Sequence, residues 1–132
     1  IPQRLPPPPT ILPVLEKLKS SYKLWHEYHE KLPKTQKYSL GNRIDKLFIE
    51  NVEAITSATF LPKTEKVLWL RLAIRKTDTI KILIMILWET KSLEDKKYIA
   101  LSELLAEIGR MLGGWSGQLQ KQNSPTPKAG EK

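Results

Sequence analysis

Apolar side chains recur at steps of three and four residues along the middle of this chain, from about residue 11 to about residue 121. This spacing places them on one side of an α-helix, and the pattern restarts after Pro33, after Pro62 and near Ser92. Period-two alternation between hairpin turns is absent, so no strand is expected. Helices joined by short connections pack as antiparallel neighbours. We therefore predict an all-α fold, an up-and-down antiparallel four-helix bundle.

Each predicted helix has one apolar stripe that should face the core. The stripes are Leu15, Leu18, Tyr22, Trp25, His29 and Leu32; Leu40, Ile44, Leu47, Phe48, Val52, Ile55 and Thr59; Leu70, Ala73, Thr77, Ile80, Ile84 and Leu87; and Tyr98, Leu101, Leu105, Ile108, Leu112, Trp115 and Leu119. Ser39 is placed to cap the second helix and Thr64 the third, which should run to about Lys91. Ser92 and Asp95 have the spacing of a capping box for the fourth helix.

The two ends of the chain differ in composition from the middle. Residues 1–10 contain a run of four prolines, and residues 122–132 are polar with further Pro and Gly. Prolines favour an extended segment over a helix, and a polar stretch has little apolar surface to bury. We expect disordered tails at 1–10 and 122–132 around a bundle domain at 11–121.

The residue content excludes several classes of protein. The chain has no Cys, which rules out disulfides, thiolate metal sites and a cysteine nucleophile. Its longest apolar run, residues 82–88, is far shorter than the roughly 20 residues that a membrane-spanning helix needs. We expect a soluble, cytoplasmic protein with no membrane partner.

The third predicted helix carries a second apolar face besides its core stripe. This face is formed by Leu68, Leu72, Ile82 and Ile86. A helix that is apolar on two sides is covered on both, here by its own bundle and by another subunit. These four residues are our candidate oligomer interface.

The chain is basic, with a formal net charge of +8, which favours a polyanionic partner such as nucleic acid. The candidate phosphate contacts are Arg71, Arg75 and Lys81 on the third helix, and Lys34, Lys37 and Arg43 around the first connection. Such contacts fix affinity without reading sequence, so binding should weaken steeply with salt. The competing interpretation is that these side chains only solvate helix faces and pair with nearby Glu residues.

No catalytic or metal site is expected, and neither is a cofactor. His26 and His29 are three residues apart and could share a face, but the sequence supplies no third ligand. No serine lies in a nucleophile elbow or has a His partner. Gly109 and Gly113 have Gly-x-x-x-Gly spacing, which we interpret as close packing of a neighbouring helix.

Two stretches resemble the signatures of a known family. Residues 32–44, LPKTQKYSLGNRI, resemble the "FP(K/R)xx(R/K)(F/Y)xLGxRI" turn of the accessory variability determinant family, the helper proteins of diversity-generating retroelements. Residues 102–115, SELLAEIGRMLGGW, are similar to the same family's "SExLxEIGRMLGGW" signature, which is the more specific of the two. The resemblance covers about residues 11–119. The wider superfamily includes four-helix proteins encoded within 23S rRNA intervening sequences.

The resemblance implies a homopentamer of four-helix protomers, a basic barrel that binds RNA or DNA and associates with the retroelement's reverse transcriptase. The protein would be a non-catalytic cofactor while the transcriptase copies template RNA, with errors at adenines, into complementary DNA. The family's third helix often reads "LDxLRxLLRLA"; at the corresponding residues Lys81 keeps a basic group and Met85 replaces the second one.

Two questions stay open at the level of sequence. The chain could instead be a protein of the rRNA intervening-sequence type, or a purely structural oligomeric scaffold with non-specific RNA binding. Arg110, within the second signature, could project toward a partner or brace a neighbouring helix through a carboxylate such as Glu107.

Overall fold

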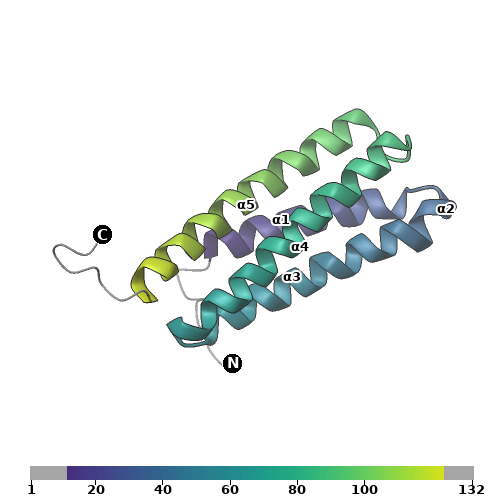
Figure 1. Cartoon of the computed structure of the whole chain (residues 1–132). Helices are drawn as coiled ribbons and strands as arrows, with labels where there is room; N and C mark the ends of the chain where they lie inside the picture. The colour runs from purple at the N-terminus through teal and green to yellow at the C-terminus, as the bar shows by residue number, and fades with distance from the viewer. Residues whose placement is uncertain (1–11, 124–132) are drawn as a thin grey trace, which may run out of the picture.

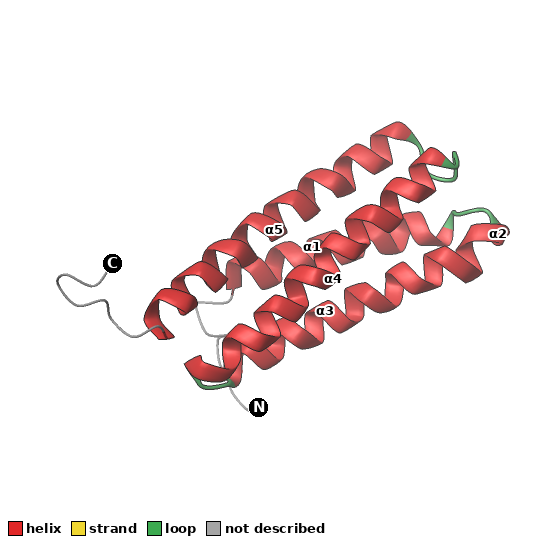
Figure 2. Ribbon diagram, in the orientation of Figure 1, coloured by secondary structure: helices red, strands yellow, loops and turns green. Residues whose placement is uncertain are grey.

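The protein folds as a bundle of antiparallel helices in a computed structural model that describes residues 12–123 (Figure 1). The elements are α1 (Leu12–Glu30), α2 (Lys34–Gln36), the π-helical turn η1 (Lys37–Gly41), α3 (Asn42–Phe60), α4 (Lys63–Glu89) and α5 (Asp95–Asn123). Figure 2 shows helices and connecting loops, and no strand, in the described range. The predicted all-α class and four-helix bundle are confirmed.

The four long helices form a ring of neighbours in which α3 packs on α4, α4 on α5, α5 on α1 and α1 on α3. Each therefore has two flanking helices and one side that turns away from the bundle. Between residues 12 and 123, no helix combines the length and the apolar character needed to cross a membrane. The predicted tails lie outside the described residues, apart from residues 122 and 123, which belong to the end of α5.

The predicted apolar stripes supply most of the core. The buried members are Leu18 and Trp25 on α1; Leu32 just after α1; Ile44, Leu47, Phe48 and Ile55 on α3; Leu70, Ala73, Thr77, Ile80, Ile84 and Leu87 on α4; and Leu101, Leu105, Ile108, Leu112 and Leu119 on α5. Complete burial of a side chain such as Leu or Ile stabilises a fold by about 1.5–3 kcal/mol. These stripes therefore provide the main stabilisation of the bundle.

A buried polar pair was not predicted. The Asn51 side chain is fully buried on α3, where its amide nitrogen donates to the Thr77 hydroxyl of α4 at 2.8 Å. That hydroxyl donates in turn to the Ala73 carbonyl at 2.8 Å. Asn51 thus lies closer to the middle of the buried face than Val52, which is only half-buried. The α3 stripe is rotated by one residue from the predicted one at this level.

The second helical segment starts earlier than predicted, and Ser39 is not its cap. Helical structure resumes directly after Pro33, whose carbonyl accepts the amide hydrogens of Gln36 and Lys37 at 2.9 and 2.8 Å. Pro33 is therefore the N-cap of this helical segment, and its φ of −57° is the angle to which the proline ring is fixed. Ser39 lies inside η1 and its hydroxyl donates to the Thr35 carbonyl at 2.9 Å.

The predicted cap at Thr64 is also wrong, for the same reason. α4 begins at Lys63, and the carbonyl of Pro62 accepts the amide hydrogens of Glu65 and Lys66 at 2.9 and 3.1 Å. Thr64 therefore lies in the first turn of α4.

The capping box at Ser92 is wrong because Ser92 closes the preceding helix. Its amide hydrogen bonds to the Leu87 carbonyl at 2.8 Å, and that of Lys91 bonds to the Trp88 carbonyl at 3.0 Å. These two bonds form a Schellman motif, in which the residue after the helix adopts a left-handed conformation. Lys91 has that conformation, with φ of 62°. α5 begins at Asp95, three residues after Ser92.

Candidate nucleic-acid interface

α4 has a buried side and an opposite, outward side. Along the outward side, residues 68, 72, 75, 79, 82 and 86 follow each other at alternating steps of four and three. This is the spacing by which one helix meets another along a seam. Leu68 is 69% exposed, Ile82 52% and Ile86 36%, whereas Leu72 is half-buried. The second apolar face predicted for this helix is therefore present and lies in the open in the single chain.

Arg71 and Arg75 lie on this outward side, one turn apart. Together with Leu68, Trp69 and Leu72 they line a shallow hollow of about 180 Å³. Both arginines are exposed, and neither forms an ion pair with a carboxylate of the described chain. The structure thus brings two of the predicted phosphate contacts onto the same side of the helix as the predicted interface residues. We call this side the outer face of α4; it carries Leu68, Arg71, Leu72, Arg75, Ile82 and Ile86.

Other basic residues of α4 are held by partners within the bundle. The Lys76 ammonium lies 2.9 Å from a carboxylate oxygen of Glu50, and this hydrogen bond lowers the pKa of Glu50 below its usual value. The Lys66 ammonium donates to the carbonyls of Ala58 and Thr59 at 2.6 and 2.8 Å, at the end of α3. The ammonium groups of these two lysines are therefore held by partners within their own bundle.

Lys81 does not join Arg71 and Arg75. It lies on the side of α4 that faces α5, where its ammonium is 3.7 Å from a carboxylate oxygen of Asp78. A Cβ atom placed on Gly109 of α5 would lie 3.1 Å from this ammonium, so the glycine leaves room for the lysine. The outer face of α4 therefore holds two of the three predicted basic residues of this helix.

The structure shows no close approach of a neighbouring helix backbone at Gly109 or Gly113 within the described residues. Gly109 admits the Lys81 side chain, as described above. A Cβ atom on Gly113 would have no other described atom within 4 Å, because this residue is exposed. Gly113 therefore does not pack against a helix of its own described chain.

The second predicted basic group lies at the α2 end of the bundle, away from the turn between α3 and α4 (Figure 1). Lys34 and Arg43 are exposed there. The Lys37 side chain is half-buried, with its ammonium 3.4 Å from the Glu30 carbonyl and 5.6 Å from the centre of the Tyr38 ring. These three residues form a separate basic surface and do not extend the outer face of α4.

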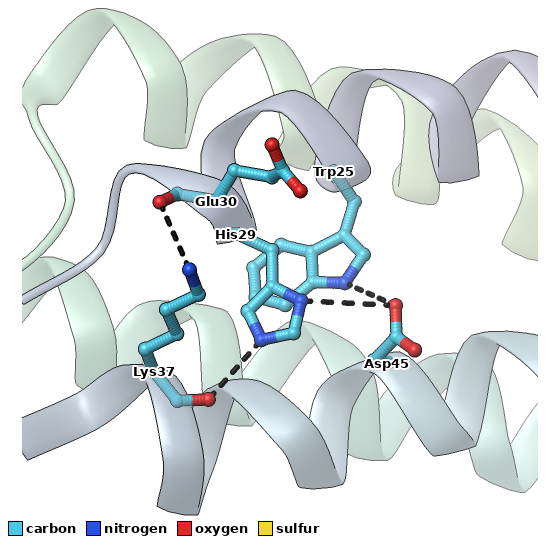
Figure 3. Close-up of polar contacts among 5 residues, drawn as sticks. All are labelled: Trp25, His29, Glu30, Lys37 and Asp45. Atoms are coloured by element: carbon cyan, nitrogen blue, oxygen red, sulfur yellow. Dashed lines mark hydrogen bonds and ion pairs between the residues drawn. The ribbon is translucent and has the colours of Figure 1, made fainter. Parts of the chain in front are cut away.

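This basic turn is held in place by a cluster that the sequence did not reveal (Figure 3). The Trp25 ring is completely buried and stacks on His29 with their centres 5.0 Å apart. Its indole nitrogen donates to Asp45 at 3.3 Å, while Nε2 of His29 donates to the Lys37 carbonyl at 3.1 Å. The His29 ring therefore fastens η1 to α1, and Gly41 packs directly beneath it.

The structure also places the two histidines that the sequence analysis considered as metal ligands. His29 Nδ1 lies 3.9 Å from Asp45, and His26 is exposed. Among residues 12–123, no group of three His, Cys, Asp or Glu side chains is placed to hold a metal ion. Asp45 also contributes to the Tyr22 environment: burial, followed by the hydrogen bond to Asp45, raises the pKa of the Tyr22 phenol. His29 therefore packs against the aromatic core and positions the turn.

Arg110 does not brace a neighbouring helix through Glu107. The Glu107 carboxylate pairs instead with the Lys17 ammonium of α1 at 3.0 Å. Arg110 is exposed, forms no ion pair with the acidic side chains of residues 12–123, and lines a cavity of about 600 Å³ at the end of the bundle. Sequence reasoning missed this cavity because its walls come from helix ends far apart in the chain.

Comparison with known proteins agrees with the resemblance seen in the two signatures. The model of the bAvd-like family matches residues 13–119, which is nearly the whole described bundle. No curated protein and no solved structure gives a significant match to the chain.

Proposed function

The chain belongs to the bAvd-like family, and on that basis we propose that it is a non-catalytic accessory protein of a diversity-generating retroelement. In this role it binds nucleic acid and the reverse transcriptase and supports mutagenic copying of template RNA into complementary DNA. The observation that carries the nucleic-acid part is the pair of exposed arginines, without carboxylate partners in the described chain, on the outer face of α4.

The proposed mechanism joins assembly to charge. The apolar residues of the outer face pack against a second copy of the chain, and closure of the ring yields a homo-oligomer, which we propose is a pentamer. Each copy then adds Arg71 and Arg75, which lie on the same outward side of α4 as these apolar residues. Repetition of these charges around an axis strengthens the local field and attracts the phosphates of one nucleic-acid strand. The contacts are to phosphate, so binding is tight at low salt and tolerant of sequence.

The phosphate contacts are tested with the double variant Arg71→Ala/Arg75→Ala. We expect weaker binding of unrelated RNAs and a shallower dependence of the logarithm of affinity on the logarithm of salt, by about 0.7–0.9 for each phosphate that the variant no longer neutralises. The matched control is Lys23→Ala/Lys96→Ala, which removes two exposed charges from α1 and α5. Equal salt slopes for the two double variants would favour the structural scaffold over the nucleic-acid-binding protein.

The interface is tested with Ile82→Glu, which places a charge among the apolar residues of the outward side of α4. Light scattering should show loss of the oligomer, since burying an unpaired carboxylate in an interface is strongly unfavourable. Ile99→Glu is the control, because Ile99 is 53% exposed on α5. An Ile82→Glu protein with the mass of the unaltered oligomer contradicts the proposed seam.

Association with a reverse transcriptase is tested by co-purification. Tagged protein should retain the transcriptase encoded next to it after nuclease treatment, and loss of the transcriptase on nuclease treatment would show that only RNA links the two. A gene neighbourhood with a reverse transcriptase beside imperfect repeats supports the retroelement. A neighbourhood inside a 23S rRNA gene supports the intervening-sequence type instead.

A further inference from the structure

The residues that line the cavity with Arg110 come from the start of α1, the start of α4 and the second half of α5. The starts of α1 and α4 and the end of α5 lie at the same end of the bundle (Figure 1). Its volume of about 600 Å³ lies within the range of 300–1,000 Å³ common for small-molecule sites. It is separate from the hollow on the outer face of α4 and from the basic surface around η1. Four of its lining residues, Arg110, Met111, Gly114 and Trp115, belong to the second sequence signature, but none of the proposed phosphate contacts lies in it.

The walls of this cavity carry an excess of positive charge. Lys63, Lys66 and Arg110 line it, and no Asp or Glu is among the lining residues from the described range 12–123. Lys66 is anchored to the end of α3 by its two carbonyl bonds, and its burial lowers the pKa of its ammonium group. Arg110 has no carboxylate partner among the described residues and can present its planar guanidinium to an oxyanion. Arg110 therefore gives the cavity a group that binds an anionic ligand.

Part of the lining is aromatic and apolar, and it comes from α5, the helix that also carries Arg110. Met111 and Trp115 are one turn apart on α5 and both are half-buried. Gly114 lies between them in the lining, and a Cβ atom there would have no other described atom within 4 Å, so this part of the wall is open. Gln118 adds a side-chain amide one turn further along. An indole beside a side-chain amide suits a planar heterocycle.

We propose that this cavity holds one nucleotide unit, with the base against Trp115 and the phosphate near Arg110 and Lys63. The inference rests on the proposed nucleic-acid binding and adds to it a place where a single unpaired base is held. The same chemistry has two sources, a free nucleoside monophosphate or an unpaired nucleotide within a strand.

The first experiment fills the cavity. Gly114→Leu adds an isobutyl group to the cavity wall, while Gly113→Leu adds the same group at an exposed position outside the lining. Both variants keep every charge, and both replace glycine in the same helix. Binding of a labelled single-stranded RNA and of an abasic strand of equal length is measured by fluorescence anisotropy. The unaltered protein and Gly113→Leu should prefer the base-bearing strand by about tenfold, the effect of one stacked base.

The result expected for Gly114→Leu is loss of that preference, with binding of the abasic strand unchanged. Trp115→Ala should lose the preference as well, and Trp115→Phe should keep part of it because the phenyl ring still stacks. Equal binding of base-bearing and abasic strands by the unaltered protein overturns the proposal, as does an equal preference in Gly114→Leu and Gly113→Leu. In either case the salt-dependent binding through Arg71 and Arg75 can still be intact, so failure here is distinct from failure of the proposed function.

Competition separates the two sources of ligand. Adenosine monophosphate that abolishes the preference for the base-bearing strand identifies a site for free nucleotide, and a preference that survives millimolar adenosine monophosphate identifies a site for a strand. Inorganic phosphate at the same concentration should leave the preference unchanged. If phosphate alone removes it, the cavity is a simple anion site and the stacking proposal is wrong.

Discussion

Replacement of Gly41 by alanine should destabilise the protein, although alanine is the better helix former. A Cβ atom at position 41 would lie 2.8 and 2.9 Å from Cδ2 and Nε2 of His29, and 3.1 Å from the Gln36 carbonyl oxygen. The His29 ring would have to retreat by about 0.6 Å to reach the 3.4 Å at which ordinary contact begins. It is held on one side by the stack with Trp25 and on the other by its hydrogen bond to the Lys37 carbonyl.

The size of the effect follows from these contacts. Overpacking of this kind costs about 1–3 kcal/mol, and loss of the hydrogen bond adds about 0.5–1.5 kcal/mol. Replacing a glycine within a helix by alanine stabilises the helix by about 1 kcal/mol. We expect Gly41→Ala to lower the free energy of unfolding by about 1–3 kcal/mol, with the urea m-value unchanged. Gly113→Ala, at an open helix position, should instead raise it by about 1 kcal/mol.

Urea denaturation followed by circular dichroism measures both variants, at one protomer concentration because an oligomer gains stability with concentration. The clash is assigned to His29 by a double-mutant cycle, in which Gly41→Ala should cost less in a His29→Ala background than in the unaltered chain. If Gly41→Ala is as stabilising as Gly113→Ala, or costs the same with and without His29, the proposed packing of η1 under His29 is wrong.

Three further predictions concern the bundle itself. Lys91→Gly should raise the free energy of unfolding by about 1 kcal/mol in urea denaturation, because Lys91 has φ of 62° and glycine adopts this conformation without strain; no gain would contradict the left-handed cap. Thr77→Val should cost about 1–3 kcal/mol by leaving the buried Asn51 amide without its acceptor, and Asn51→Leu/Thr77→Val should recover most of this loss, since both polar partners are then gone. Lys76→Met should cost up to about 1 kcal/mol at neutral pH. Because Lys76 lowers the pKa of Glu50 below its usual 4.5, that cost should disappear as the pH falls through and below about 4.5, and a cost that persists at low pH would exclude the ion pair as its source.

The sequence predicts the core of this fold well because helical periodicity directly encodes which side of each helix is buried. The stripe on α4, from Leu70 to Leu87, is buried as predicted. Its second apolar face is present on the outward side of the helix, and Arg71 and Arg75 lie on it. These features depend only on spacing along one helix, so neighbouring helices have little influence on them.

Helix starts were predicted poorly because hydroxyl residues compete with prolines and with the preceding helix for the same role. Ser39 and Thr64 lie inside helical turns that had already begun after a proline. Ser92 is used to close α4. Which of two capping devices is used depends on where the chain must turn to reach its neighbour, and local sequence does not contain that information.

The remaining misses are contacts between elements. Spacing along the helix grouped Lys81 with the other basic residues of α4, and only the position of α5 shows that it lies over Gly109 instead. The cavity around Arg110 and Trp115 requires the ends of three helices to be placed together. The buried Trp25 was predicted as core, but its bond to Asp45 and its stack on His29 depend on the path of η1.

The link between assembly and RNA binding is measured most directly by the affinity of the Ile82→Glu variant for RNA at near-physiological salt. This variant retains Arg71 and Arg75 but lacks the proposed seam. If repeated copies are what makes the basic surface effective, the variant should be monomeric and should bind far more weakly than the unaltered protein at equal protomer concentration. A monomer that binds RNA as tightly as the unaltered protein would contradict this account of the outer face of α4.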